Sequence, residues 1–218
     1  EVFYEDDETF STFIYKTKSE KYLIIGSEST LTSEYRFLDA NNPEGEFKII
    51  QPRTRELEYS VDHFGDHFYI RTNLDALNFR LMKTPVTATE KENWEEVIAH
   101  REDVYFSNFE IFRDYLVVSE RKEGLTELRV MPWENGEEHY IDFDEEVYTV
   151  RLNVNLEFDT DVLRFSYTSL TTPNSIFDYN METRERELLK EEEILGNFNK
   201  NDYVTKRIYA PARDGKMI

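Results

Sequence analysis

The sequence predicts an all-β fold, a fragment of a β-propeller with about four four-stranded antiparallel blades. Three observations support this. An alternating motif occurs four times along the 218 residues, each copy is flanked by further strand-like runs, and aromatic residues make up 15% of a chain with only 7 Gly and 6 Pro. Large flat side chains at alternating positions favour packed strands over flexible chain.

The repeated motif begins at Lys21, Asp66, Asp114 and Asp161, so its copies lie 45, 48 and 47 residues apart. After these residues it reads YLIIGS, HFYIRT, YLVVSE and VLRFSY, the predicted second strand of each blade. Each copy is followed by EYRFLDA, NFRLMKT, ELRVMPW or SIFDYNM, with another alternating run before the pair and a shorter one after it. Because a lone four-stranded sheet has two faces to cover, such units stack around a shared axis.

The predicted blades span residues 11–51, 56–100, 103–143 and 147–190. Residues 1–5 are expected to be the outer strand of a preceding blade, which gives a propeller portion of 1–192. Residues 188–198 are expected to form a short helix or loop, and 202–218 a strand, a turn at Asp214-Gly215 and the start of a second strand. Since a ring cut open leaves an apolar face on each terminal blade, we expect the chain to self-associate or to have mobile end blades.

Composition excludes several classes of partner and site. With 46 Asp and Glu against 26 Lys and Arg, the net charge is −20, which repels nucleic acid and attracts cationic ligands. No apolar run is long enough to cross a bilayer, and the first residues lack the pattern of a signal peptide. Because the sequence has no cysteine, it has no disulfides or thiolate metal sites, and we expect a cytoplasmic location.

The segment 159–218, DTDVLRFSYTSLTTPNSIFDYNMETRERELLKEEEILGNFNKNDYVTKRIYAPARDGKMI, resembles the junction between the propeller and the peptidase domain in oligopeptidase B (protease II), of the prolyl oligopeptidase family of serine peptidases. Residues 22–50 and 57–73 are similar to that family too. The resemblance implies a seven-bladed propeller over an α/β-hydrolase domain that begins within 193–218. It also implies gated cleavage of oligopeptides after Arg or Lys, without a cofactor.

The chain lacks the motif that would carry this chemistry. A hydrolase of this class places its Ser in a G-x-S-x-G turn, but the glycines lie at 26, 45, 65, 124, 136, 196 and 215, and no two are four apart. We therefore assign no catalytic residue, leave the substrate-binding residues unassigned, and expect this chain alone to be inactive. Its expected partners are basic oligopeptides and the α/β-hydrolase domain of the same protein.

Two histidines and three acidic runs are candidates for metal-binding or peptide-binding sites. His63 and His67 have a spacing that suits zinc on a helix, but Gly65 between them favours a hairpin turn, so no metal site is expected. The runs 5–8, 142–146 and 191–193 lack the glycine and spacing of a calcium loop. They are expected to be solvated turns, with a channel lining that attracts basic peptides as the alternative. His100 and His139 have no evident partner.

The remaining polar and aromatic candidates have structural interpretations. Arg36, Arg80 and Arg129 recur at one place in the repeat, with Asp178 taken to fill it in the fourth copy, and are expected to form ion pairs or pack between neighbouring blades. The hydroxyl residues 168–172 are expected to bond local backbone in a loop. Trp94 and Trp133 are expected to pack rather than to stack on sugars.

Two alternatives remain open. The first is a non-catalytic propeller that binds basic peptides or proteins. The second is a glycoside-processing propeller with paired carboxylates in a central pocket, which the clustering of carboxylates in turn-like runs disfavours.

Overall fold

The protein, seen here as a computed structural model that describes residues 2–134 and 136–218, contains four four-stranded antiparallel sheets. We call them blades 1 to 4. Blade 1 comprises β1 (Ser11–Lys16), β2 (Tyr22–Glu28), β3 (Ser33–Asp39) and β4 (Lys48–Ile49), and blade 2 comprises β5 (Tyr59–Phe64), β6 (His67–Thr72), β7 (Arg80–Pro85) and β8 (Glu95–Ile98). Blade 3 comprises β9 (Val104–Ile111), β10 (Tyr115–Lys122), β11 (Leu125–Pro132) and β12 (His139–Tyr140), and blade 4 comprises β13 (Tyr148–Leu152), β14 (Val162–Ser169), β15 (Ser175–Asn180) and β16 (Arg186–Glu191).

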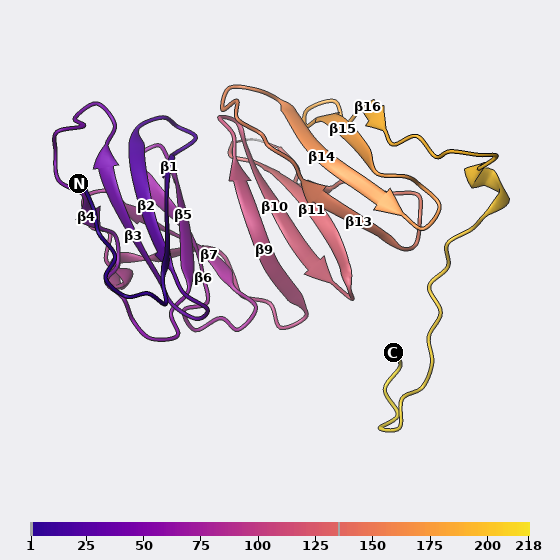
Figure 1. Ribbon diagram of the computed structural model, residues 1–218, viewed down its shortest axis with the longest axis horizontal. Helices are drawn as coiled ribbons and strands as arrows, with labels where there is room; N and C mark the ends of the chain where they lie inside the picture. The colour runs from indigo at the N-terminus through magenta and orange to yellow at the C-terminus, as the bar shows by residue number, and fades with distance from the viewer. Residues whose placement is uncertain (1, 135) are drawn as a thin grey trace.

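The strand order in every blade follows the chain, and the blades stand side by side in chain order (Figure 1). This confirms the predicted all-β propeller fragment. Two 3₁₀ helices, η1 (Lys91–Asn93) and η2 (Lys200–Asp202), are the helical segments among the described residues. None of them is long and apolar enough to cross a membrane.

Each blade has two ends, which we name by their loops. The turn end carries the loop between the first and second strands, and the connection end carries the segments that lead from one blade to the next (50–58, 99–103 and 141–147). A two-residue hairpin turn lies at the connection end of blade 3, where Lys122 pairs with Leu125 around Glu123 and Gly124. Their φ angles of 48° and 83° are those of a type I′ turn, which matches the twist of the flanking strands.

The core consists of three clusters, one between each pair of neighbouring blades. Alternation along the middle strands explains this division. In β10, Leu116 and Val118 pack toward blade 2 while Val117 packs toward blade 4, and all three are at most 1% exposed. Each central sheet is therefore buried on both faces, which is why its second strand is a continuous apolar run.

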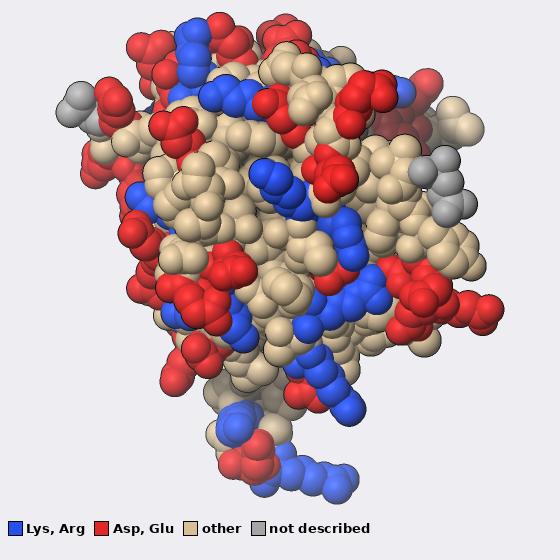
Figure 2. Space-filling model, turned by 90° about the vertical axis from the view of Figure 1, so that its left-hand side faces the viewer, with Lys and Arg blue, Asp and Glu red and all other residues tan. Residues whose placement is uncertain are grey.

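The two outward faces of the fragment differ in polarity. On blade 1, Ile14, Ile25, Arg36 and Ile49 are successive partners in the strand register, with Ile14 64% and Ile49 41% exposed. Figure 2 shows this side, where uncharged residues fill much of the centre, a band of Lys and Arg crosses it, and acidic residues gather toward the rim. The apolar face predicted for the first blade is thus present in part.

On blade 4 the predicted apolar face is wrong. On its outward face Thr149 pairs with Thr168, Arg151 with Ser166, and Arg164 with Asp178 through two hydrogen bonds of 2.7 Å. The apolar residues of β14, such as Phe165, alternate to the other side and pack against blade 3. Alternation in a strand with one outward face puts its polar residues on that face.

The terminal segments add little regular structure. Residues 2–5 form no strand, contrary to our expectation for 1–5, because no strand lies beside them as a ladder partner; Glu1 is outside the described residues. Beyond β16 the chain leaves the sheet (Figure 1) but returns to the connection end, where the Arg207 amide donates to Glu146 at 3.1 Å. It ends in a hairpin-like turn with a single bridge between Pro211 and Met217. The expected strand after residue 202 is absent up to Tyr209.

Candidate functional site

The first strands of the blades form the inner edge of the stack. They lie at one side of each sheet, and β5 contacts β9 across the interface between blades 2 and 3. In a propeller the inner edges surround the central channel. We therefore take the side chains on and beside β1, β5, β9 and β13 as the candidate functional surface.

A buried ionic cluster links three blades at the turn end of this surface. Lys18, in the loop after β1, places Nζ 2.8 Å from Oε1 of Glu110 on β9. The same ammonium lies 3.4 Å from the ring centroid of Phe112, and the Lys18 amide donates to Asp62 of β5 at 3.3 Å. The Lys18 side chain is only 7% exposed and that of Glu110 is 23% exposed. Lys18 thus binds Glu110 of blade 3 through its ammonium and Asp62 of blade 2 through its backbone amide.

Strand register explains why the two carboxylates meet. Asp62 is paired with Tyr69 and Glu110 with Val117, residues that occupy the same position in their repeats. Both acidic side chains therefore stand at equivalent places on neighbouring inner strands. In blade 1 the equivalent residue is Tyr15, which pairs with Ile24 and donates its hydroxyl to the Val61 carbonyl at 2.6 Å.

Burial dominates the titration of this cluster. It raises the pKa of Asp62 to about 6, although the carboxylate accepts hydrogen bonds from two backbone amides. Burial also raises the pKa of Glu110, against the attraction of Lys18, and lowers the pKa of Lys18, against the attraction of Glu110. The cluster is therefore held as charged groups at a cost, and its charge state responds to pH.

His63 lies beside this cluster, in the hairpin between β5 and β6. The predicted hairpin is confirmed, because Phe64 pairs with His67 around a turn at Gly65. His63 is buried, hydrogen-bonds through Nδ1 to the Ser19 hydroxyl at 2.8 Å, and burial lowers its pKa to about 4. Among residues 2–134 and 136–218, no group of three or more His, Asp or Glu side chains is arranged to hold a metal ion.

The other two histidines have partners that the sequence did not reveal. Nε2 of His100 accepts from the Asn78 amide at 3.2 Å, and Nε2 of His139 lies 2.8 Å from the Tyr179 hydroxyl. Both contacts are local supports of a strand or connection. They give neither ring a catalytic arrangement.

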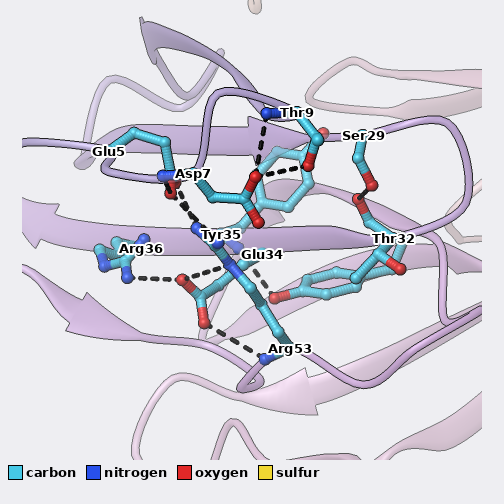
Figure 3. Close-up of polar contacts among 10 residues, drawn as sticks. Glu5, Asp7, Thr9, Ser29, Thr32, Glu34, Tyr35, Arg36 and Arg53 are labelled. Carbon is cyan, nitrogen blue, oxygen red and sulfur yellow. Dashed lines mark hydrogen bonds and ion pairs between the residues drawn. The ribbon is translucent and has the colours of Figure 1, made fainter.

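A second charged cluster anchors the N-terminal segment to blade 1 (Figure 3). Glu34 is 5% exposed and lies between two arginines, with Oε1 at 2.5 Å from Arg36 Nη2 and Oε2 accepting from the Arg53 amide at 3.2 Å. Arg53 continues the chain of contacts to Glu5, and the guanidinium of Arg36 lies 4.3 Å from the ring centroid of Phe3. The acidic run 5–8 is therefore partly engaged in ion pairing, and is not simply a solvated turn.

The three arginines form ion pairs within their own blades, but the prediction that they share one position is wrong for Arg80. It stands opposite Thr72, two residues from the position that Arg36 and Arg129 share. Arg36 pairs with Glu34, Arg80 with Glu96 at 3.2 Å, and Arg129 with Glu120 at 2.7 Å. Glu120 also accepts from Arg101, in the connection between blades 2 and 3.

The placement of Asp178 in this series is wrong. Arg36 and Arg129 stand opposite Ile25 and Val118, equivalent residues whose counterpart in blade 4 is Phe165. The residue opposite Phe165 is Phe177, while Asp178 stands opposite Arg164 on the other face. A shift of one residue moves a strand side chain to the opposite face, so the two positions are not interchangeable.

The acidic run 142–146 borders a groove of about 750 Å³ at the connection end of blade 4, closed on one side by residues 200–205. Glu145 accepts from the Tyr167 hydroxyl at 2.7 Å and from Thr171, and Glu146 accepts from the Arg207 amide at 3.1 Å. These carboxylates hold the loop and the C-terminal segment in place.

The hydroxyl run and the tryptophans occupy the places expected from sequence. Thr168 donates to the Thr172 carbonyl at 3.1 Å, and Ser169 accepts from the Thr172 amide at 2.8 Å, so the run bonds local backbone. Trp133 stacks on Phe64 at a centroid distance of 4.7 Å, and Trp94 is 8% exposed within the core. Both indoles pack, as predicted.

Comparison with known proteins places this geometry in a family. The family model described as "Prolyl oligopeptidase, N-terminal beta-propeller domain" matches residues 1–192. The chain belongs to this family. Its four blades, stacked in chain order, are part of that domain.

Relatives and solved structures agree with the family. The chain is 42% identical over 216 residues to dipeptidyl aminopeptidase BI of Pseudoxanthomonas mexicana and 32% identical over 218 residues to protease 2 of Moraxella lacunata, and these matches cover 99% and 100% of the chain. Oligopeptidase B of Leishmania major matches with a TM-score of 0.87 at 30% identity, and that of Trypanosoma brucei with 0.88 at 28%, each over 99% of the chain. The chain spans 30–32% of the length of these proteins.

Sequence reasoning missed the Lys18, Asp62 and Glu110 cluster. One signal was available, because both carboxylates come four residues before the start of the repeated motif, at Asp66 and Asp114. Lys18 could not be identified from the sequence as their partner, because it lies 92 residues from Glu110 in the chain.

Proposed function

We propose that this chain is the substrate-gating part of a serine endopeptidase of the oligopeptidase B type, which cleaves oligopeptides after Arg or Lys. The observation that carries the proposal is the family match over residues 1–192, supported by 42% identity to a peptidase along nearly the whole chain. In this role the propeller is a steric filter. An unfolded peptide passes between side chains that line a narrow channel, and a folded protein does not.

The described geometry suits a filter that must keep its shape. Each blade interface is a continuous apolar cluster, and the inner edges of blades 1 to 3 are joined by Lys18 and Glu110 at 2.8 Å. A gate then opens more easily by movement between domains than by separation of these blades, because surfaces between domains are generally smaller and more polar.

The chemistry is assigned to another part of the protein. The chain has no G-x-S-x-G motif, so the proposed nucleophile belongs to an α/β-hydrolase domain of the same protein. We assign residues 1–192 to the propeller and 193–218 to the linker and the start of that domain. In support, the segment after β16 crosses the connection end, where Arg207 contacts Glu146 and the Glu123 carbonyl.

Charge supports the proposed preference for basic peptides. The net charge of −20 produces a field that attracts cationic substrates before they bind. Selection of Arg or Lys at the scissile bond is assigned to the hydrolase domain. A cytoplasmic location fits a sequence without cysteine.

The proposal is tested in the full-length protein that contains this chain. A fluorophosphonate probe should label one serine, and internally quenched peptides should be cut after Arg or Lys but not after Ala at the same position. N-acetylated peptides separate the two reactions named among the relatives, because an endopeptidase cuts them and a dipeptidyl aminopeptidase does not. Hydrolysis should fail when the same peptide sequence is held inside a folded domain. Cleavage of the folded protein at the rate of the free peptide contradicts gating.

The alternative function is a non-catalytic module that binds basic peptides or proteins. It is favoured by the groove beside blade 4, whose lining includes Asp144, Glu145, Glu146 and Glu191. Absence of serine labelling together with binding of Lys- and Arg-rich peptides that weakens with salt would establish this alternative.

A further inference from the structure

A groove of about 380 Å³ opens between blades 3 and 4 on the inner side of the stack. Its walls come from β9, β10 and β13. Because β13 packs chiefly on β11, the inner part of the blade 3 face is left uncovered. Arg121 and Tyr105, which are register partners on β10 and β9, stand on this uncovered face near the connection end.

The groove carries hydrogen-bond donors and positive charge. Arg121 is exposed on the blade 3 wall, where the register partners Ser119 and Asn108 also line the groove; Arg151 borders it on β13, between Val150 and Leu152, which face blade 3. No lining residue is acidic. Among the residues that the structure describes, neither arginine lies within ion-pair distance of a carboxylate.

A third arginine supports the groove from behind. Arg71 donates from Nη2 to the Tyr105 hydroxyl oxygen at 3.2 Å and from Nε to the Phe106 carbonyl at 2.8 Å. The guanidinium also packs 3.5 Å from the ring centroid of Phe79, which fixes its position. Since the Tyr105 oxygen accepts from Arg71, its own proton is free to be donated into the groove.

These features are unusual for this chain. With 46 acidic against 26 basic residues, most of its surface repels an anion. The grooves of about 750, 510 and 540 Å³ each include carboxylates in their linings, whereas this one offers guanidinium, phenol, hydroxyl and amide donors. Arginine binds carboxylates through two parallel hydrogen bonds, which makes a carboxylate the ligand class that best matches the lining.

We propose that this groove binds a carboxylate of the peptide substrate, with Arg121 and Tyr105 as its direct partners. The proposal deepens the proposed function and rests on it for the identity of the ligand as a peptide. Arg121 lies three residues before Gly124, whose turn is contacted by Arg207 of the C-terminal segment. The groove thus lies at the end of the stack toward which the proposed hydrolase domain extends, where part of a bound peptide can reach it.

The test uses the full-length protein and fluorescein-labelled peptides with reduced, non-hydrolysable peptide bonds. Three otherwise identical peptides carry a free C-terminal carboxylate, a C-terminal amide, or a C-terminal amide with one internal Glu. Fluorescence anisotropy gives the dissociation constant of each. We expect the free acid to bind more tightly than the amide, and Arg121→Gln to weaken the acid alone by about two- to fivefold, the range of an exposed charge pair.

One further variant and one control make the result specific. Tyr105→Phe keeps the ring and removes only the hydroxyl, so it should weaken binding of the free acid in the same direction. Arg55→Gln is the matched control, because it removes one positive charge from a side chain that is 92% exposed and lies in the connection after blade 1. It should leave the preference for acid over amide unchanged.

Each outcome decides the matter. Tighter binding of the internal-Glu peptide than of the free acid assigns the groove to acidic side chains, and the reverse assigns it to the peptide C-terminus. Equal binding of all three peptides, or an equal loss of affinity in Arg121→Gln and Arg55→Gln, would refute carboxylate binding in the groove. If the protein still hydrolyses ordinary peptides, the proposed function is unaffected by that result. If the protein prefers the free acid and Arg121→Gln abolishes this preference, carboxylate binding in the groove is supported. If the same protein hydrolyses no peptide, the proposed peptidase function is refuted.

Discussion

Replacement of Lys18 by Met should lower the free energy of unfolding by about 2–3 kcal/mol at about pH 8. Removing one partner of a buried ion pair generally costs about 3–5 kcal/mol, because the other charge stays buried without compensation. The Glu110 side chain is 23% exposed, so water partly solvates the carboxylate that remains. The expected loss of unfolding free energy therefore lies at or below the lower end of that range. Met is an unbranched side chain of similar length without a charge, so the substitution chiefly removes the ammonium that lies 3.4 Å from the Phe112 ring centroid.

The loss should shrink as the solution is acidified. Without the ammonium, Asp62 and Glu110 face each other's field in a partly buried site, and their raised pKa values rise further. Protonation then removes the uncompensated charge in the variant. The difference in unfolding free energy between the parent and Lys18→Met should therefore be largest at about pH 8 and decrease toward about pH 5.

Urea unfolding followed by tryptophan fluorescence measures this difference, since Trp133 stacks on Phe64 in the interface between blades 2 and 3. Glu110→Gln and the double variant complete a mutant cycle, with an expected coupling of about 1–2 kcal/mol. A Lys18→Met variant that unfolds at the same urea concentration as the parent, or a loss that does not change with pH, would refute this account of the cluster.

Further predictions concern Asp62 and His63, the buried Glu120 of blade 3, and the outward face of blade 1. Burial raises the pKa of Asp62 to about 6, so its contribution to stability is present below about pH 4 and lost as pH rises through about 6. Burial lowers the pKa of His63 to about 4, so its contribution is present above about pH 6.5 and lost as pH falls through about 4. As the pH rises from about 4 to about 8, the free energy of unfolding of Asp62→Asn should increase by about 1–3 kcal/mol relative to that of the parent. The free energy of unfolding of His63→Gln should fall less than that of the parent as the pH drops through about 4. If either variant shows the same pH dependence as the parent, the corresponding prediction is contradicted. Glu120→Gln should cost about 3 kcal/mol in thermal unfolding, because Glu120 is 0% exposed and holds Arg129 at 2.7 Å and Tyr140 at 2.8 Å, and a variant with the parental melting temperature would contradict this. Ile14→Asp on the apolar face of blade 1 should reduce self-association of this chain in light scattering, whereas Thr149→Asp on the polar face of blade 4 should not, and a monomeric parent would remove the expectation.

The repeat explains why so much of the fold was predictable. Each blade is encoded locally, by alternating apolar runs of four to eight residues and by turns such as Glu123-Gly124, and the spacing of the copies sets their number. Strand identity depends on neighbours in the sequence, so the pattern is visible without coordinates. The hairpin between His63 and His67 and the packing of Trp133 were predictable for the same reason.

The sequence-based predictions were wrong where the outcome depended on a one-residue shift in strand register or on the presence of a neighbouring strand. The assignment of Asp178 to the arginine series was off by a single position, and in a strand that is the opposite face. The outward face of blade 4 was expected to be apolar by analogy with a buried blade, but it carries Thr149, Thr168, Arg164 and Asp178. The strand expected at residues 1–5 depended on partners that do not lie beside the described residues.

The sequence by itself determined that this protein is built from four similar antiparallel sheets that must bury their faces against one another. Only the tertiary structure decided which charges meet at the inner edge, where Lys18 reaches Glu110 across 92 residues and Arg121 stands in a groove without an acidic partner. The physical reason is that backbone pairing and alternation act over a few residues, whereas ion pairs and grooves depend on the rotation and offset of whole sheets.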